Sequence, residues 1–342
     1  GKEVIAETAI RCGCGGYFGY PITPQSEVME TLMLRKPWEE TGMVVLQAES
    51  EVAAINMVYG GASCGKKVMT SSSSPGISLK QEGITYIVDV MRGGPGLGTI
   101  QPSQSDYFQA TKGGGHGDYH LIVLAPASVQ EMSDFVVLGF DLAFKYRNPA
   151  MVLADGVIGQ MMEKVVLPDY TPRRTEEEIE KQCGDWALTG KKNRERHVIT
   201  SLELEAHRQE VFNEKLQRKY REIEANEVRY EMLNCEDADY IFVAYGSTAR
   251  ICQKSIQLAR EAGIKVGLLR PITLYPFPMK PISDLCSKVK GFLSVEMSAG
   301  QMVEDVRLAV DGRVKVDHYG RMGGVVPTPE EIVVALKEKF SI

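Results

Sequence analysis

The stretch VVLQAESEVAAINMVYGGASCG, residues 44–65, decides the fold class. Its first residues, 44–46, form a short apolar run that predicts a buried strand, and Ser50 then begins a segment with helical periodicity. The apolar residues at that spacing are Val52, Ile55 and Val58. Glu49 and Glu51 therefore stand between the carboxyl end of a strand and the start of a helix, where open α/β sheets bind ligands.

These two carboxylates have two interpretations. Acidic residues suit the first turn of any helix because they complement its dipole. A carboxylate at the ligand-binding edge of a sheet can also exchange a proton with a bound molecule. Glu51 is the leading catalytic candidate, and Glu49 is the local alternative.

The chain before this stretch predicts a helix from Lys2 to Arg11 and a strand from Tyr17 to Tyr20. The sequence GYPITPQSE follows, and its two prolines favour an extended turn before the next helix. Thr23 then lies at a strand-to-helix corner, where its hydroxyl faces the region above the sheet. A rigid turn without a ligand is the alternative.

The chain after this stretch predicts two more strands, at 66–70 and 87–91. The first ends in SSSSPG, residues 71–76, which predicts either a polar turn or a row of hydroxyl groups at the same edge. The second delivers Arg92 and the glycines of RGGPGLGT, and a guanidinium binds a carboxylate bidentately. The helical pattern at 78–86 runs into this strand without turn residues, which suggests that residues are missing between Tyr86 and Val88.

The remaining pattern predicts an α/β protein with two doubly wound units. A strand at 121–125, a helix at 129–146 and a strand at 150–154 complete the first unit, which we place at residues 1–167. Residues 168–237 form a charged connector with one long helix, and residues 238–342 form the second unit. Because G-x-G-x-x-G follows none of the strands predicted in the first unit, a Rossmann-type nucleotide site is not expected.

Composition argues against several other classes. The 342 residues carry a net charge of −6 with well-mixed signs, so we expect neither a nucleic-acid partner nor a membrane surface. The absence of a long apolar run and of a signal sequence predicts a cytoplasmic protein. The seven cysteines contain no C-x-x-C run, so we expect reduced thiols and neither a metal site nor an iron–sulfur cluster in this chain.

Several stretches together resemble the alpha subunit of the 2-oxoacid:ferredoxin oxidoreductases. They span almost the whole chain, and their residues resemble those of the branched-chain type, which acts on 2-oxoisovalerate, more than those of the pyruvate or 2-oxoglutarate types. They are GYPITPQSE, QAESEVAAINMVYGGA, TSSSSPG, RGGPGLGTIQPSQSD, RPITLYPFP, VEMSAGQMVEDVRLA, GRMGG and PTPEEI.

The resemblance implies a thiamine-diphosphate enzyme that oxidatively decarboxylates a 2-oxoacid, passes electrons to ferredoxin and forms an acyl-CoA. This chain would supply a pyrimidine-binding domain and a transketolase C-terminal-like domain. A beta subunit would bind the diphosphate and Mg²⁺, and a ferredoxin-like subunit would hold iron–sulfur clusters. A gamma subunit is a further candidate partner, with ferredoxin and CoA as the reactants that the complex shares.

The resemblance also implies roles for individual residues. Glu51 matches the glutamate that contacts the aminopyrimidine ring, where a carboxylate sharing a proton with a ring nitrogen favours the imino form that acts as a base. Thr23 and Arg92 match the threonine and arginine that contact the substrate carboxylate or keto oxygen. The other residues implied to line the cofactor are Pro21, Ile22, Ser73 and Ser74.

Two other functions fit part of this pattern. The beta chain of the decarboxylase component of a 2-oxoacid dehydrogenase complex pairs the same domain types, but the YPITP corner and the long connector count against it. A non-catalytic scaffold subunit is the second, because half of the cofactor site must come from another chain. The presence of Glu51, Thr23 and Arg92 together argues against a silent subunit.

Overall fold

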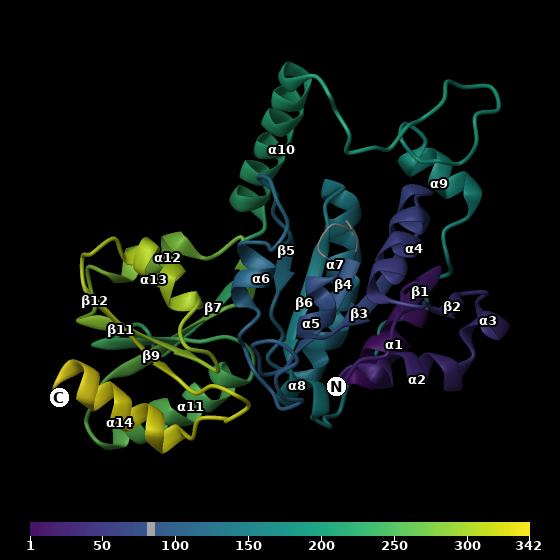
Figure 1. Cartoon of the computed structure of the whole chain (residues 1–342). Helices are drawn as coiled ribbons and strands as arrows, with labels where there is room; N and C mark the ends of the chain where they lie inside the picture. Colours follow the sequence, from purple (N-terminus) through teal and green to yellow (C-terminus); the bar gives the residue numbers. More distant parts are fainter. Residues whose placement is uncertain (81–85) are drawn as a thin grey trace.

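The computed structural model describes residues 1–80 and 86–342, and it contains two sheets, each covered by helices on both faces (Figure 1). The first sheet has the order β10-β5-β6-β4-β3-β1-β2, and all its neighbours are parallel except β10, which is antiparallel to β5. This arrangement confirms the α/β, doubly wound class. Its strands are β1 (Gly16–Gly19), β2 (Val44–Gln47), β3 (Val68–Ser72), β4 (Tyr86–Met91), β5 (Ile122–Leu124), β6 (Ala150–Asp155) and β10 (Thr273–Tyr275).

Helices pack on both faces of the first sheet because its central strands are apolar on both sides. One face is covered by α1, α2 and α7, which share a buried core with the end of α10. The other face carries α4, α5 and α6 and joins the core of the second unit. The helices of this unit are α1 (Lys2–Arg11), α2 (Ser26–Arg35), α3 (Pro37–Glu40), α4 (Glu51–Ser63), α5 (Ser74–Ser78), α6 (Tyr107–Thr111), α7 (Val129–Tyr146) and α8 (Gly156–Gln160).

The second sheet has the order β12-β11-β8-β9-β7 and is parallel except for β7. Helices α11 and α14 cover one face, and α12 and α13 join the core shared with the first unit. The strands are β7 (Tyr230–Leu233), β8 (Tyr240–Val243), β9 (Val266–Pro271), β11 (Gly291–Glu296) and β12 (Lys315–Gly320). The helices are α11 (Gly246–Glu261), α12 (Met279–Leu285), α13 (Met302–Val310) and α14 (Pro329–Phe340).

Strand β2 corrects one prediction. The run at 44–46 was expected to be buried, but Val44 and Leu46 are 50% and 43% exposed. The reason is that β2 forms the edge of the first sheet, where β1 is its one pairing strand among residues 1–80 and 86–342. An apolar run specifies a strand, but it does not specify which side of the strand is covered.

Two strands cross the predicted unit boundaries. β10, from the RPITLYPFP stretch, completes the first sheet by pairing Thr273 with Leu124. β7, from the end of the predicted connector, forms an edge of the second sheet. The helix expected at 78–86 is also different, because α5 ends at Ser78 and Tyr86 begins β4. Residues 81–85 of that prediction lie outside the described residues. Missing residues were suspected between Tyr86 and Val88, but the structure continues there as one strand.

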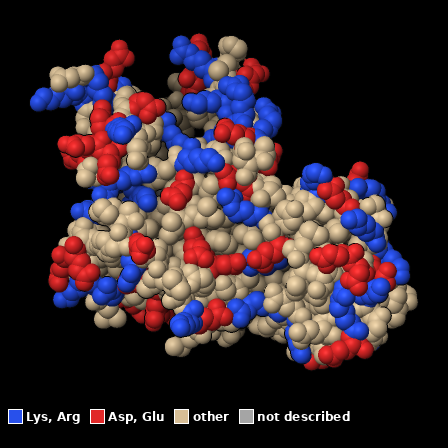
Figure 2. Space-filling view, turned by 180° about the vertical axis from the view of Figure 1, so that it is seen from behind, with Lys and Arg blue, Asp and Glu red and all other residues tan. Residues whose placement is uncertain are grey.

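The connector contains α9 (Glu176–Cys183) and the long α10 (Ala206–Asn226), joined by an arm that arches away from the two sheets (Figure 1). The hydrophobic side chains of α10 are buried only near its end, at Tyr220 and Ile223, whereas Phe212 is 46% exposed. Acidic and basic residues are interspersed over the face in Figure 2. Within residues 1–80 and 86–342, no helix combines the length and apolar character needed to cross a bilayer.

The start of α4 yields a first testable prediction. Ser50 is the N-cap, and its Oγ accepts a hydrogen bond from the Ala53 amide at 3.2 Å. We expect Ser50→Ala to lower the free energy of unfolding by about 1 kcal/mol, the usual value of such a cap, measured as a lower melting temperature of the complex. Asn56→Ala is the matched control because Asn56 is exposed on the same helix and alanine favours helix. Equal melting of the Ser50→Ala variant and the wild type would contradict this role.

Candidate active site

The candidate residues gather at the carboxyl ends of neighbouring parallel strands. Glu51 begins α4 after β2, the serines span the end of β3 and the start of α5, and Arg92 follows β4. β3 pairs in parallel with both β1 and β4, so the ends of these strands open to the same edge of the sheet. The structure therefore brings these residues to one edge of the sheet, the edge at which open α/β sheets bind ligands.

Glu51 and Glu49 differ in their surroundings. Glu51 is 8% exposed, whereas Glu49 points to solvent. The side chain of Glu51 reaches the first turn of α5, because a Cβ added to Gly76 would lie 3.0 Å from Glu51 Oε1 and 2.2 Å from Ser72 Oγ. This burial favours Glu51 over Glu49 as the residue that acts on a ligand.

The serine run is buried along its whole length. Ser71 exchanges hydrogen bonds with Tyr17 at 2.7 Å and with Gln25 at 2.5 Å. The hydroxyl groups of Ser72 and Ser73, by contrast, have no partner among the described residues although both are fully buried. Of the two predictions for this run, the row of hydroxyl groups at the strand end is the correct one.

Arg92 connects two parts of the site. Its Nη1 donates to the Thr23 carbonyl at 2.8 Å, and its Nη2 donates to the Leu97 carbonyl at 3.0 Å. The Nε atom of this 8% exposed residue is buried without a partner among the described residues. Since a guanidinium has five N–H donors, the group retains capacity to bind an anion.

The turn that carries Thr23 lies beside Arg92. Thr23 and Pro21 are exposed, and Ile22 is half-buried with its carbonyl accepting a hydrogen bond from the Gln25 amide at 3.0 Å. The structure thus brings the Arg92 side chain to the backbone carbonyl of Thr23. It also joins Ser74 to Arg92, because Ser74 Oγ accepts from the Arg92 amide at 3.1 Å.

A pair of buried acids lies beneath Arg92 and was not predicted. Asp106 accepts a hydrogen bond from Ser74 Oγ at 2.5 Å, whereas neither carboxylate oxygen of the neighbouring Asp89 has a partner among the described residues. Burial, and then the charge of Asp106, raises the pKa of Asp89 well above its ordinary value. Burial raises the pKa of Asp106 to about 6, against the hydrogen bond from Ser74. Burial therefore favours the protonated form of both carboxyl groups.

Lys80 is a second buried charge that was not predicted. It is fully buried, and its Nζ donates to Thr70 Oγ1 at 2.8 Å and to the Ser71 carbonyl at 3.0 Å. Burial lowers the pKa of the Lys80 ammonium to about 8, although the charges of Glu51 and Asp89 oppose this shift. The fold consequently carries a desolvated cation behind the serine run.

The lowered pKa of Lys80 predicts a pH dependence of stability. Between pH 8 and 10.5 the unfolded chain keeps a proton on Lys80 that the folded chain has released. Folded stability should therefore rise with pH in this window, by about 1.4 kcal/mol per pH unit from this group. Melting curves are compared for complexes that carry the wild-type chain or Lys80→Met. The melting temperature of the wild type should rise relative to that of the variant as the pH increases from 8 to 10.5. A constant difference would contradict a buried Lys80.

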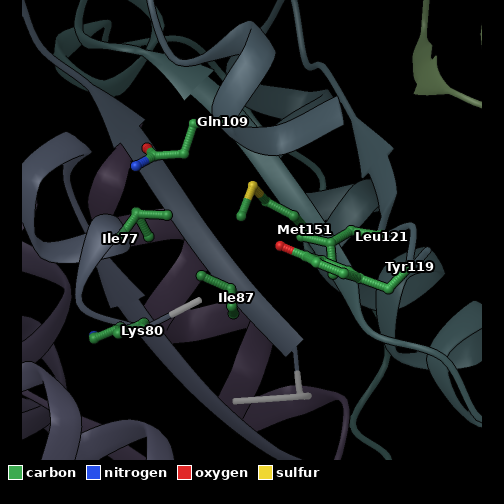
Figure 3. A pocket seen from close by; sticks show the side chains of 7 residues that line it. All are labelled: Ile77, Lys80, Ile87, Gln109, Tyr119, Leu121 and Met151. Atoms are coloured by element: carbon green, nitrogen blue, oxygen red, sulfur yellow. The ribbon is translucent and has the colours of Figure 1, made fainter. Parts of the chain in front are cut away.

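A small pocket lies near the starts of β4 and β6, away from the edge that carries Arg92. Figure 3 shows it against the paired strands β4 and β6, where most of the lining side chains are apolar and Lys80 lies at one end. The lining residues are Ile77, Lys80, Ile87, Gln109, Tyr119, Leu121 and Met151. Because Ile87 and Met151 stand near the starts of their strands, this pocket is separate from the edge that carries Arg92. Within the described ranges, no cluster of three or more His, Cys, Asp or Glu side chains could hold a metal ion.

Some of the missed residues carried a signal in the sequence. Asp89 interrupts the otherwise apolar strand YIVDVM, and an acid inside a buried strand indicates a functional or paired group. Asp106 and Gln104 end the quoted stretch RGGPGLGTIQPSQSD. Gln104 bonds to the second unit and Asp106 bonds to Ser74, and the local sequence shows neither contact.

Comparison with known proteins places these residues in a family. Residues 7–231 match the family described as pyruvate flavodoxin/ferredoxin oxidoreductase, thiamine diphosphate-binding. Residues 238–332 match pyruvate:ferredoxin oxidoreductase core domain II. The ketoisovalerate oxidoreductase subunit VorB of Methanothermobacter thermautotrophicus is 48% identical over 348 residues, which cover 99% of this chain and 96% of that subunit.

Two solved structures share the fold. A 2-oxoglutarate:ferredoxin oxidoreductase from Magnetococcus marinus, with 2-oxoglutarate, coenzyme A and succinyl-CoA bound, has a TM-score of 0.83 and 28% identity. The match covers 99% of this chain, which spans 64% of the length of that one. A split-gene transketolase, an inactive beta4 tetramer, has a TM-score of 0.61 at 11% identity over 99% of this chain and 97% of its own, a likeness of fold alone. Because it is 48% identical to the ketoisovalerate subunit over nearly its full length, the chain belongs to the 2-oxoacid:ferredoxin oxidoreductase family.

Proposed function

We propose that the chain is the subunit that activates thiamine diphosphate and binds the oxoacid in a CoA-acylating 2-oxoacid:ferredoxin oxidoreductase. The substrate is 2-oxoisovalerate or a related branched 2-oxoacid, which is converted to an acyl-CoA and CO₂ while the electrons pass to ferredoxin. The observation that carries the proposal is the buried carboxylate of Glu51 at the same sheet edge as Arg92.

The residues present fit the pyrimidine end of thiamine diphosphate. Glu51 is a buried carboxylate, and the Ser72 and Ser73 hydroxyl groups lack partners among the described residues. A ring that carries both nitrogen acceptors and an amino donor would satisfy such groups. Gly76 packs closely against this carboxylate, because an added Cβ would lie 3.0 Å from Glu51 Oε1. Ser73, Ser74, Pro21 and Ile22 are the further residues that we assign to this cofactor.

Each residue of the chain has a definite role in this proposal. When bound, thiamine diphosphate supplies the carbanion chemistry of the decarboxylation. Glu51 holds a proton at its carboxylate and shares it with a ring nitrogen, which a glutamine could not do. Arg92 and Thr23 orient the substrate carboxylate, and Arg92 is pre-positioned for this task by its bond to the Thr23 carbonyl. The acid pair under Ser74 fixes the backbone at Arg92.

The enzyme requires other chains. We propose a beta subunit that binds the cofactor diphosphate and Mg²⁺, and a ferredoxin-like subunit that holds the iron–sulfur clusters, with a gamma subunit as a further component. CoA and ferredoxin are the reactants that the complex shares. The seven free cysteines support a reducing, cytoplasmic location. The domain boundaries at 167 and 237 remain part of the proposal, with a pyrimidine-binding domain before the connector and a transketolase C-terminal-like domain after it.

The substrate assignment is supported by the difference in identity between relatives. The chain is 48% identical to the ketoisovalerate subunit and 28% identical to the 2-oxoglutarate:ferredoxin oxidoreductase chain. These relatives offer no support for the beta chain of a dehydrogenase complex or for a silent scaffold. The branched substrate is therefore the first to test.

The experiment compares three oxoacids on one complex. The complex is purified anaerobically through a tag on this chain, and kcat/KM is measured for 2-oxoisovalerate, pyruvate and 2-oxoglutarate with a one-electron dye. We expect CoA-dependent reduction with 2-oxoisovalerate leading. A different leading oxoacid would overturn the substrate assignment but keep the enzyme class. No reduction from a complex loaded with cofactor and clusters would overturn the class.

A further inference from the structure

We propose that Gln104 is a positioning residue, through which the second unit holds Arg92 in place for the substrate. The inference rests on the proposed function, because it takes Arg92 as the group that binds the oxoacid carboxylate. It assigns the second unit a task in this reaction besides completing the fold. Gln104 acts through the segment 92–106, which we call the arginine loop.

The arginine loop is closed on itself at its base. Arg92 forms an isolated antiparallel bridge with Pro102, and the Gly93 amide donates to the Gln101 carbonyl at 3.0 Å. Beyond this base, the tip is exposed, with Leu97 80% and Ile100 54% accessible to solvent. The position of the Arg92 guanidinium, which donates to the Leu97 carbonyl, thus depends on how the base of the loop is held.

Gln104 holds that base to the second unit with every polar atom it has. Its side-chain Nε2 donates to the Tyr245 carbonyl at 2.8 Å and to Asp155 Oδ2 at 3.2 Å. Its Oε1 accepts from Thr248 Oγ1 at 3.0 Å and from the Met297 amide at 3.1 Å. Its backbone amide donates to the Met297 carbonyl at 3.0 Å, and its carbonyl accepts from the Tyr245 hydroxyl at 3.1 Å. Gln104 is fully buried.

The burial of Gln104 makes these bonds consequential. A buried amide that loses its partners leaves polar groups unsatisfied, which costs more than the bonds alone contribute. Three of the four partner residues belong to the second unit: Tyr245 is the N-cap of α11, Thr248 lies in α11, and Met297 directly follows β11. The fourth, Asp155, ends β6 and also accepts the Ser247 amide at 2.8 Å. Gln104 therefore sits at the centre of the junction between the two units.

Neighbouring contacts hold the same loop from the second unit. Gln301 donates to the Ser105 carbonyl at 2.7 Å and accepts from the Phe108 amide at 2.8 Å. The GRMGG turn approaches the base, because a Cβ on Gly324 would lie 2.2 Å from Gln101 Cβ. The first unit holds the other side of the loop through Ser74, which bonds to Asp106 and to the backbone of Arg92. Arg92 is thus fixed between the two units.

A merely structural role for Gln104 makes a different prediction. In that case its loss would lower the melting temperature of the complex and leave the affinity for the oxoacid unchanged. A positioning role requires that the oxoacid steps suffer selectively, since misplacing a substrate-orienting group lowers kcat/KM. It also requires that the effect disappears once the Arg92 guanidinium is gone.

The experiment compares two variants of the complete complex. Gln104→Met removes the polar side-chain atoms at nearly constant volume. Gln301→Met removes fewer hydrogen bonds, those to Ser105 and Phe108, and is used if the first variant does not assemble. Arg250→Gln is the matched control, because Arg250 also links the second unit to the first but bonds to the Ala127 carbonyl and to Glu163, outside the arginine loop. KM and kcat are measured for the oxoacid and for CoA, with and without Arg92→Lys, together with amide exchange in residues 93–101.

We expect Gln104→Met to lower kcat/KM for the oxoacid about 10-fold or more, with KM for CoA unchanged. In the Arg92→Lys background the same change should lower kcat/KM less than about 3-fold. Exchange in residues 93–101 should accelerate in Gln104→Met and not in Arg250→Gln. Independent effects of the two substitutions, or equal exchange in both single variants, would overturn the proposal. If the wild-type complex turns over no oxoacid, the proposed function fails, and the exchange comparison still decides whether Gln104 fixes the loop.

Discussion

Replacing Glu51 by glutamine is expected to lower kcat for the oxoacid at least about 100-fold, the scale of a lost general acid–base group. Glutamine preserves the size and a hydrogen-bonding oxygen, but it cannot hold the proton that the proposal assigns to this carboxylate. The side chain is 8% exposed, so water is poorly placed to replace it. Steady-state dye reduction by the anaerobic complex measures the effect.

The neighbouring carboxylate supplies the control. Glu49 is two residues away and exposed, and Glu49→Gln should leave kcat close to the wild-type value. Size-exclusion chromatography should show that both variant complexes assemble like the wild type. A Glu51→Gln complex that keeps wild-type turnover would remove Glu51 from the chemistry. A large loss in the Glu49 variant instead would exchange the two roles.

Replacing Arg92 by lysine is expected to raise KM for the oxoacid by about 10- to 100-fold, because a charge-assisted hydrogen bond contributes about 1.5–3 kcal/mol. Lysine keeps the charge but loses the planar fork that binds a carboxylate bidentately. Its single ammonium nitrogen also replaces the two separate nitrogens with which Arg92 donates to the Thr23 and Leu97 carbonyls. Initial rates over a range of oxoacid concentrations measure KM.

The second substrate supplies the internal control for Arg92. The KM for CoA in the same assays should stay within about 2-fold of the wild type if only the oxoacid carboxylate has lost its partner. A parallel rise in both KM values would indicate a general distortion of the site. An unchanged KM for the oxoacid would assign its carboxylate to another residue.

Sequence predicted the fold where the signal is local. The strand-to-helix alternation fixed most elements, and α7 begins and ends at the expected residues, Val129 and Tyr146. The failures lie where partners are distant in the sequence. β2 is an exposed edge strand because nothing pairs with its outer side among the described residues, and β10 pairs with β5 across about half the chain, at Thr273 and Leu124.

The site shows the same limit. Glu51, Arg92 and the serines could be predicted because each follows a recognisable strand. The buried groups that support them could not, because their burial comes from packing between segments that are far apart. Asp89 is buried beside Asp106, and Gln104 is hydrogen-bonded to the second unit. Local periodicity contains no information on these contacts.

The measurement that tests the central claim most directly is the product balance of the anaerobic complex supplied with 2-oxoisovalerate, CoA, thiamine diphosphate and oxidised ferredoxin. Oxidative decarboxylation releases an electron pair for each CO₂ lost and each acyl-CoA formed, and ferredoxin takes one electron at a time. We predict equal amounts of CO₂ and branched acyl-CoA, with reduced ferredoxin at about twice that amount, all abolished without thiamine diphosphate. Acyl-CoA formation that continues without the cofactor, or CO₂ release without ferredoxin reduction, would contradict the account.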